Sequence, residues 1–350
     1  MKVVCDGRVA CARKESLPVS KDCSKQTADS NVGSIIGPWV ACFYSLSEVF
    51  PYQVSSTNAA HAYNGLVFQG CDPLMLKLLS KLPLPVLYLF SGVLYCLLYY
   101  VVRYRRKVVA AHLQQAFPDK CAAERKLIAK KFYRGFSDVT VEALYSGNMS
   151  REEVSERVQF KNIELLESLL DQGSSFILLG GHCCNWEWLL LSIGAKLPIP
   201  VNAVYKPLHN KSVDRFMLET RSRFNVEPIP HQEFMNEVVK RKRSQRVYGI
   251  LADQRPRNKG RAHITQFLNR ETRCFIGPEK IAQFVKIPVV FMKMTRLSRG
   301  RYQLAFELLA EPPYKKERDS YPLTERYIRK LEEQIMETPE DWLWSNRRWK

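Results

Sequence analysis

Apolar residues along this chain follow two spacings, one typical of helices and one of buried strands. Helical spacing marks the segments 161–172, 185–197 and 212–224. Short apolar runs that resemble buried strands lie at 174–181, 201–205, 247–252, 288–294 and 302–309. Helices and strands that alternate in this way predict an α/β fold, in which a mixed, mostly parallel sheet is flanked by helices.

One apolar segment, 82–102, contains no charged residue. Its length matches the roughly 20 residues that cross a bilayer core. Four basic residues within 103–107 follow it, and the positive-inside rule places that end on the cytoplasmic side. Pro83 and Pro85 near its start leave a monotopic anchor or a buried core helix open. We predict an N-terminal membrane-anchoring element, transmembrane or monotopic, over 74–107.

The rest of the chain divides into an extension and a body. Residues 1–73 show no sustained period and no signal peptide, which predicts a weakly structured extension. The sequence from Met75 onward opens as a natural protein would, so the extension is a candidate non-native segment. Residues 108–350 are predicted to form a cytoplasmic domain. Its first two helices should be separated at Pro118 and Asp119.

The charge balance changes this picture, because 53 Lys+Arg against 35 Asp+Glu give a formal net charge of +18. Such a surface suits a polyanionic partner. The basic run 240–246 and the terminal Arg347, Arg348 and Lys350 are candidate contacts for an acidic carrier protein or a phosphorylated headgroup, with a solvated helix face as the alternative. No nucleic-acid recognition motif is present, so we expect no nucleic-acid partner. The ten cysteines form no CxxC pair, which indicates reduced thiols facing the cytosol.

The stretch GGHCCNWEW, residues 180–188, carries the densest group of reactive side chains. A histidine beside a carboxylate has a fixed tautomer and a stabilised imidazolium, as a general base for an alcohol requires. His182 and Glu187 would point apart on one continuous helix. If His182 precedes the first turn, with Asn185 as its N-cap, the chain can bend the two side chains together.

Three other interpretations of this stretch stay open. A metal site would need ligands that close tetrahedrally, for which the run His182, Cys183, Cys184 is cramped. A thiol nucleophile is the second, although two adjacent cysteines on a turn would point in different directions. The third is a loop histidine with a structural hydrogen bond.

Three polar residues each follow an apolar run that we predict as a strand: His182, Lys206 and Asp253. Ligands in open α/β sheets bind beyond the carboxyl ends of the strands. We therefore expect these three side chains to converge.

Four motifs in order, GGHCCNWEW, YKPLHN, ADQRP and the terminal WLWSNRRWK, resemble the bacterial lipid A biosynthesis acyltransferase family. These are the late acyltransferases of the lysophospholipid acyltransferase superfamily, and the resemblance covers about 75–350. It implies an O-acyltransferase at the bacterial inner membrane, with its catalytic domain on the cytoplasmic face. The implied reaction moves a fatty acyl chain from acyl carrier protein to a hydroxyl of a lipid A precursor.

The resemblance leaves two alternatives open and implies no cofactor. A coenzyme A thioester could replace the carrier-protein donor, and a glycerophospholipid or another amphiphile could replace the acceptor. No metal ion and no organic cofactor is implied. Inner-membrane lipids are expected partners in either case.

The resemblance also implies roles for individual residues. His182 would act as general base and Glu187 would orient its imidazole. Lys206 stands where the family commonly has arginine, which keeps the cation but loses the bidentate fork. Asp253 matches an aspartate near the family's histidine, with capping of the next loop as the alternative. Cys184 stands where the family often has glycine, and its bulk is expected to crowd the acceptor hydroxyl.

Substrate contacts complete the predicted site. We expect Lys206, Asp253 and Asn185 to bind substrate. Lys206 would bind an acceptor phosphate or stabilise developing negative charge.

Overall fold

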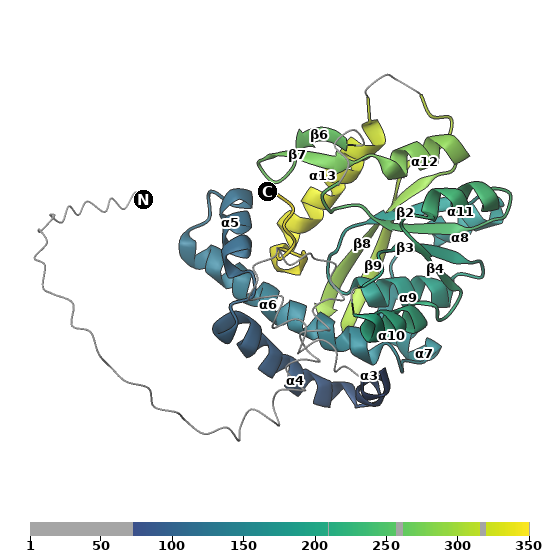
Figure 1. The fold of residues 1–350 in the computed structure, drawn as a ribbon. Helices are drawn as coiled ribbons and strands as arrows, with labels where there is room; N and C mark the ends of the chain where they lie inside the picture. The colour runs from purple at the N-terminus through teal and green to yellow at the C-terminus, as the bar shows by residue number, and fades with distance from the viewer. Residues whose placement is uncertain (1–72, 209, 257–261, 316–319, 350) are drawn as a thin grey trace, which may run out of the picture.

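The computed structural model describes residues 73–208, 210–256, 262–315 and 320–349, and a seven-stranded sheet forms its centre (Figure 1). The strand order is β1-β9-β8-β2-β5-β3-β4, with every neighbouring pair parallel except β8 and β9. This arrangement confirms the predicted mixed, mostly parallel α/β sheet. The predicted extension lies outside the described residues, apart from residue 73.

The bounds of the strands match the predicted apolar runs at the centre of the sheet. The strands are β1 Val158–Phe160, β2 Phe176–Gly180, β3 Val201–Tyr205, β4 Val226–Pro230, β5 Val247–Leu251, β8 Val289–Ser298 and β9 Arg301–Ala310. A separate antiparallel hairpin pairs β6 Ala262–Gln266 with β7 Glu271–Phe275. The sequence pattern did not predict β1, β4 or this hairpin. The prolines Pro228 and Pro230 are tolerated in β4 because it is an edge strand.

Helices cover both faces of the sheet. They are α3 Pro73–Ser80, α4 Leu84–Cys96, α5 Arg106–Ala116, α6 Ala122–Tyr145, α7 Arg151–Arg157, α8 Glu164–Asp171, α9 Trp186–Lys196, α10 Lys211–Arg221, α11 Phe234–Arg241, α12 Gly277–Val285 and α13 Pro322–Glu337. β2 is buried throughout, and its side chains alternate between two cores. Ile177 and Leu179 pack with residues of α12 and α13, whereas Phe176 and Leu178 pack with residues of α9 and α10.

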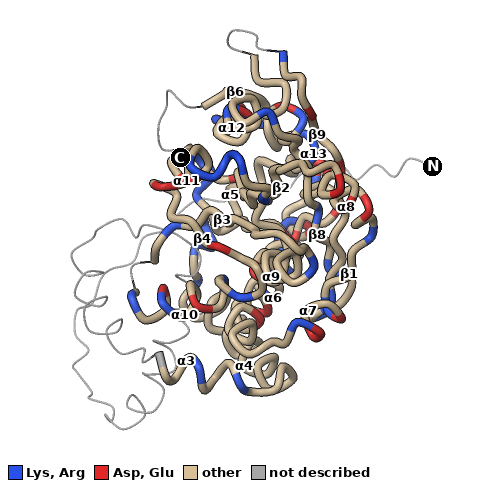
Figure 2. The backbone as a smooth tube through the Cα atoms, turned by 90° about the vertical axis from the view of Figure 1, so that its right-hand side faces the viewer, with Lys and Arg blue, Asp and Glu red and all other residues tan. Residues whose placement is uncertain are grey.

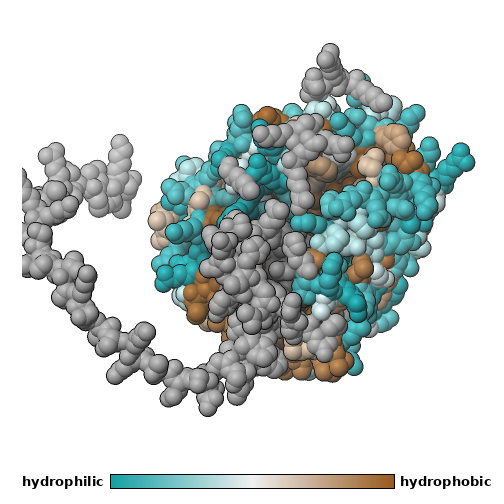
Figure 3. Space-filling model, viewed as in Figure 1, coloured by the Kyte–Doolittle hydropathy of each residue, from teal (hydrophilic) through white to brown (hydrophobic). Residues whose placement is uncertain are grey.

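The predicted anchoring helix is present as α4, which continues as a π-helical turn over Leu97–Val101. Within the described residues, one helix is long and apolar enough to cross a membrane, Leu84–Val101, with a mean hydropathy of 1.8. One face of α4 packs on α6, since Leu87 and Leu94 are buried. Its outer face carries Leu89, which is 74% exposed, and Val93, which is 59% exposed. Figure 3 shows hydrophobic surface along the lower edge of the molecule, where α3 and α4 lie.

The C-terminal segment returns to the end of β2. After α13, a 3₁₀ turn over Pro339–Asp341 leads into an irregular stretch with three buried apolar residues, Trp342, Leu343 and Trp344. Cys183 and Trp342 form an isolated antiparallel bridge. The chain's end therefore lies against the turn that follows β2, where the predicted histidine is found.

Candidate active site

A sharp turn joins β2 to α9, and it carries His182. Gly181 is required in this turn, because a side chain there would approach Leu331 Cδ1 of α13 to 2.6 Å. The backbone oxygen of His182 accepts a hydrogen bond from Leu343 N at 3.1 Å. The turn is thus held between α13 and the C-terminal segment, which fixes the position of His182.

The two cysteines of the turn face the interior. Cys183 is 3% exposed and Cys184 is 2% exposed, and burial raises the pKa of both thiols well above the ordinary value. A thiol that stays protonated is a poor nucleophile, so this placement disfavours thiol catalysis. Cys184 Sγ lies 3.4 Å from the carbonyl oxygen of Met294. Its backbone has φ of 53°, in the left-handed region that glycine favours.

Asn185 caps α9 as predicted. Its Oδ1 accepts a hydrogen bond from Trp188 N at 2.9 Å, and its Nδ2 donates to Glu142 Oε2 at 2.8 Å. The Tyr302 hydroxyl donates to the same Glu142 oxygen at 2.6 Å. The Asn185 side chain is fully buried among these groups and does not line the pocket beside His182. The structure therefore places Asn185 behind the site, contrary to the expectation of a substrate contact.

His182 is paired with the carboxylate of Asp253, which follows β5. The distance from His182 Nδ1 to Asp253 Oδ1 is 2.6 Å. The other oxygen, Oδ2, accepts a hydrogen bond from Trp342 Nε1 at 2.9 Å. Burial would raise the pKa of Asp253, which is 1% exposed, but the facing imidazole and these hydrogen bonds outweigh it and lower this pKa. Asp253 is therefore a carboxylate at neutral pH.

Glu187 makes a different pair, so the predicted contact between Glu187 and His182 is wrong. Its carboxylate is bound by the Arg221 guanidinium of α10 through two hydrogen bonds, of 2.8 and 2.5 Å. The physical reason is the start of α9 at Trp186, one residue before Glu187. The first turn of that helix directs Glu187 toward α10, while His182 stays in the turn and meets the end of β5.

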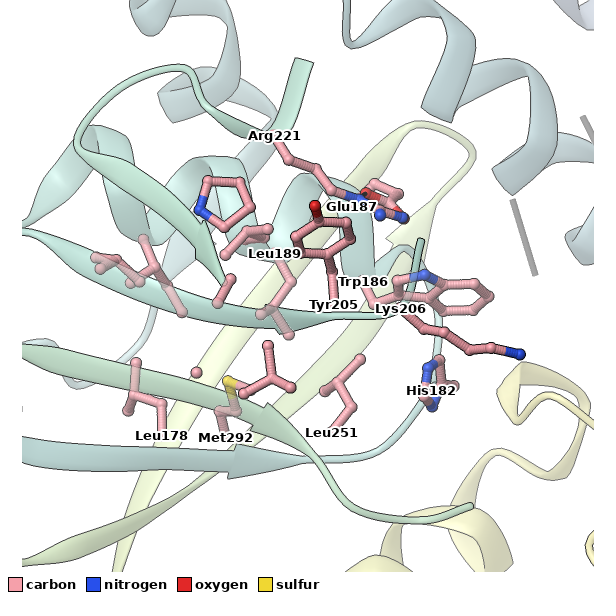
Figure 4. A pocket seen from close by; sticks show the side chains of 17 residues that line it. Leu178, His182, Trp186, Glu187, Leu189, Tyr205, Lys206, Arg221, Leu251 and Met292 are labelled. Atoms are coloured by element: carbon pink, nitrogen blue, oxygen red, sulfur yellow. Dashed lines mark hydrogen bonds and ion pairs between the residues drawn. The ribbon is translucent and has the colours of Figure 1, made fainter. Parts of the chain in front are cut away.

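A pocket of about 850 Å³ opens beside His182 (Figure 4). Its inner part is apolar, between the sheet and α9, and its lining includes Leu178, Leu189, Ile193, Leu251 and Met292. Polar side chains gather toward its other part, namely His182, Glu187, Tyr205, Lys206 and Arg221. The pocket thus joins a hydrophobic interior to a mouth with a histidine and two cations.

Lys206 lies at this mouth, after the end of β3, as its strand-end position predicted. Figure 4 shows its side chain extending to the same side of the pocket as His182. Because β2, β5 and β3 are neighbours in the sheet, His182, Asp253 and Lys206 all follow adjacent parallel strands. The predicted convergence of these three residues is confirmed.

Two further residues touch the imidazole of His182. Gln254 Nε2 lies 3.2 Å from His182 Nε2 and 3.5 Å from Nδ1, so the amide sits beside the ring and not along one lone pair. The Trp186 ring meets the imidazole edge-on, with ring centroids 5.3 Å apart. The imidazole is therefore confined on its sides.

Sequence reasoning did not assign roles to three residues of the site. Trp342 and Gln254 fall inside the motifs WLWSNRRWK and ADQRP, so the motifs marked the segments without showing what each side chain contacts. Arg221 lies in a helical segment with no motif, and nothing in the sequence pointed to its pairing with Glu187. Within the described residues, no group of three or more His, Cys, Asp or Glu side chains is arranged to hold a metal ion.

The chain is similar to known proteins over most of its length. The family model described as "Bacterial lipid A biosynthesis acyltransferase" matches residues 60–350. The lipid A biosynthesis palmitoleoyltransferase of Escherichia coli K12 is 23% identical over 310 residues, 86% of this chain and 96% of the relative. The lipid A biosynthesis acyltransferase of Shigella flexneri gives the same values. The lipid A biosynthesis lauroyltransferase of E. coli K12 is 23% identical over 301 residues, 84% of this chain and 94% of the relative.

Proposed function

Because the chain belongs to the bacterial lipid A biosynthesis acyltransferase family, we propose that it transfers a fatty acyl chain from a thioester to a hydroxyl of a lipid A precursor, with His182 as general base. The observation that carries this proposal is the 2.6 Å contact between His182 Nδ1 and Asp253 Oδ1 at the mouth of an apolar pocket. The proposal replaces Glu187 with Asp253 as the carboxylate that orients the histidine.

The geometry supports a direct transfer. Asp253 accepts a hydrogen bond from Nδ1–H, which leaves Nε2 as the basic nitrogen of the ring. Nε2 takes the proton of the acceptor hydroxyl while the hydroxyl oxygen attacks the thioester carbonyl. The tetrahedral intermediate then collapses to the ester, the carbon–sulfur bond breaks, and the imidazolium returns the proton to the leaving thiolate. The lowered pKa of Asp253 supports this step because a carboxylate stabilises the imidazolium.

The two parts of the pocket suit the two parts of an acyl thioester. The apolar interior, lined by residues such as Leu178 and Met292, would hold the acyl chain. Lys206 at the mouth would stabilise negative charge on the carbonyl oxygen or bind a phosphate of the acceptor. The Glu187–Arg221 pair would shape the wall between these parts. Asn185 contributes through the start of α9 and makes no substrate contact in this proposal.

The proposed donor and cellular site are supported by the family and by the charge of the chain. An acidic carrier protein carrying the acyl chain would be attracted by a surface of net charge +18, and a coenzyme A thioester offers the same reacting bond. We place the protein at the bacterial inner membrane, with residues 108–350 on the cytoplasmic face. The apolar outer face of α4 would lie in the bilayer while its other face stays on α6.

A monotopic position of α4 at the membrane interface fits its polar contacts better than a transmembrane position. Near its middle, Ser91 donates to the buried Asp138 carboxylate, which also receives the Arg299 guanidinium. Charged groups at the centre of a bilayer are costly. An interfacial position leaves Arg299, whose side chain is 46% exposed, within reach of water.

An acyl-transfer assay tests the proposed function. The full chain is supplied with carrier-protein and coenzyme A thioesters, and with an under-acylated lipid A precursor or a lysophospholipid, and the product masses name donor and acceptor. We expect acyl transfer to the lipid A precursor, reduced by about 10² to 10⁴-fold in His182→Ala. His263→Ala, which removes a histidine of the β6–β7 hairpin, is the matched control. Transfer to lysophospholipid alone would show that the acceptor is a glycerophospholipid. Undiminished transfer by His182→Ala would refute the mechanism.

A further inference from the structure

A wide basic groove lies beside the end of the apolar helix, between α5 and α6. Its volume is about 1750 Å³, and seven cationic side chains line it with no carboxylate among its lining residues. They are Arg103, Arg105, Arg106, Lys107, Arg125, Lys126 and Arg347. We call this feature the basic groove.

Three of these cations are held in place by backbone oxygens. Arg105 donates to the backbone oxygen of Ser345 at 3.0 Å, Arg106 to that of Tyr99 at 3.1 Å, and Arg125 to that of Phe117 at 3.2 Å. A carbonyl oxygen fixes a guanidinium but carries no net charge to cancel it. For the other four, no carboxylate lies within ion-pair distance in the part of the chain that the structure describes. The groove therefore keeps its positive charge.

Some cations outside the groove are paired with carboxylates. In the basic run 240–246, Arg241 and Arg246 both pair with Glu227, and Arg241 also pairs with Glu237 at 2.6 Å. Arg and Glu likewise alternate along α7, where Figure 2 shows blue and red side by side. This pairing disfavours the run as the main contact for an anion.

The two described residues of the basic tail also differ from each other. Arg348 is 2% exposed and donates to the backbone oxygen of Arg273 at 2.8 Å, which is a structural role. Arg347 is exposed and lines the basic groove. Lys350, the third residue of the predicted contact, lies outside the described residues.

The groove adjoins the apolar face that we propose to lie in the bilayer. Tyr100 is 51% exposed, Val101 is 70% exposed and Val102 is 40% exposed, and Arg103 of the groove comes next. Cations immediately beside a membrane-embedded segment meet the headgroup layer, where anionic phosphates concentrate. We propose that the basic groove binds the phosphate of an anionic lipid headgroup in that membrane. This inference rests on the proposed function only for the position of α4.

The shape of the groove favours a lipid headgroup over a folded acidic protein. The cations line a concavity whose walls also include Val109, Leu113 and Ala129, so they surround a hollow rather than lying on a flat surface. A compact headgroup enters such a concavity, and guanidinium forks match phosphate oxygens. The first turn of α5 has no side-chain cap, and its N-terminal residues line the groove, which adds a helix dipole favourable to anions.

Vesicle flotation with the full chain tests the proposal. The probes are vesicles of phosphatidylcholine, of phosphatidylcholine with phosphatidylglycerol, and of phosphatidylcholine with oleic acid at equal negative charge. The groove variant is Arg103→Gln/Lys107→Gln/Lys126→Gln. Its matched control, Lys240→Gln/Lys242→Gln/Arg243→Gln, removes the same charge from the α11 region. At about 1 kcal/mol per cation, we expect the groove variant to bind phosphatidylglycerol vesicles about 100-fold more weakly, and the control less than about threefold more weakly.

Several results would overturn this assignment. Equal losses of vesicle binding in both variants would show that the effect comes from overall charge. Equal binding to oleic acid and phosphatidylglycerol vesicles would show that phosphate is not preferred. A groove variant that binds vesicles normally, but loses transfer only from the carrier-protein thioester, would make the groove a carrier-protein site. Acyl transfer by the wild type in neutral detergent is measured in parallel. If that transfer is absent while the vesicle result holds, the proposed function fails and the groove assignment stands.

Discussion

Two buried carboxylates lie near the pocket, and they have different partners. Asp253 faces the imidazole of His182, a side chain that serves as a proton acceptor or donor in many enzymes. Glu187 faces Arg221, a guanidinium that stays charged, and although burial acts to lower the pKa of Arg221, the Glu187 carboxylate raises it. A carboxylate beside an imidazole can orient a base and stabilise its protonated form, whereas one paired with a permanent charge forms a fixed structural pair.

Replacement of Asp253 tests the first half of this comparison and has the largest expected effect. In Asp253→Asn, the amide can no longer hold Nδ1–H as a charged acceptor, and the imidazolium loses its partner. We expect turnover to fall by roughly 10³ to 10⁴-fold. The measurement is the turnover rate for acyl transfer, with thermal unfolding as the control for folding. Turnover close to wild type in a folded variant would show that His182 does not depend on Asp253.

Replacement of Glu187 should act on stability more than on chemistry. Glu187→Gln leaves the Arg221 charge buried without its partner, which costs about 3–5 kcal/mol of unfolding free energy. We expect turnover to fall less than about tenfold, with the pH dependence of kcat keeping its shape, because His182 keeps Asp253. Chemical denaturation and a pH–rate profile give the two measurements.

A double variant sharpens the result for Glu187. Glu187→Met/Arg221→Leu removes both charges and should recover most of the lost stability, since an apolar pair can replace a buried ion pair. If Glu187→Gln instead loses as much turnover as Asp253→Asn at unchanged stability, Glu187 has the catalytic role that its sequence position first predicted.

The hydrogen bond from Trp342 supplies a smaller test of the Asp253 pair. Trp342→Phe removes the donor to Asp253 Oδ2, and one hydrogen bond to a charged group is worth about 1.5–3 kcal/mol. We expect about a tenfold or greater loss of kcat/KM. Trp344→Phe is the matched control, because its indole donates to the backbone oxygen of Pro339 and not to Asp253.

The same variant has a predicted pH signature. The Trp342 hydrogen bond helps to lower the pKa of Asp253, so its removal raises that pKa. The carboxylate form of such a group is fully present above the ordinary pKa of about 3.9. Its favourable interactions are lost as pH falls through the pKa of the group in the folded protein. The acid limb of kcat/KM in Trp342→Phe should therefore move to higher pH. An unmoved acid limb would mean that this hydrogen bond does not act on the titrating pair.

The sequence predicted the frame of the site better than its contacts. Parallel strands bring their carboxyl ends to one edge, so the meeting of His182, Lys206 and Asp253 followed from three apolar runs. The partner of His182 lies 71 residues away, and spacing along the chain favoured Glu187 because it is near in sequence. Which way Glu187 points depends on where α9 begins and on Arg221, a long-range contact that no local pattern encodes.

The environment of the apolar helix α4 was equally hard to predict. Hydropathy identified the apolar segment, but its buried face depends on packing against α6 and on the contact of Ser91 with Asp138. The groove cations are visible in the sequence as a basic segment that follows this helix. That no carboxylate is among the described residues lining the groove depends on the three-dimensional arrangement of α5 and α6. Tertiary contacts, and not residue types, separate the basic groove from the partly paired run 240–246.

Replacement of Cys184 has the smallest expected effect and tests a residue that belongs to neither carboxylate pair. Its φ of 53° costs a non-glycine residue roughly 1–2 kcal/mol, while its buried thiol contributes packing that glycine would lose. In Cys184→Gly the two effects oppose, so we expect a stability change within about 1 kcal/mol. The matched control is Lys286→Gly, at an exposed position with φ of 59°, where relief of strain has no opposing loss and stability should rise.

Because Cys184 contacts Met294 and does not line the pocket, the ratio of products from competing acceptors should stay constant. A shifted ratio would show that the bulk of Cys184 reaches the acceptor after all, through the turn that carries His182.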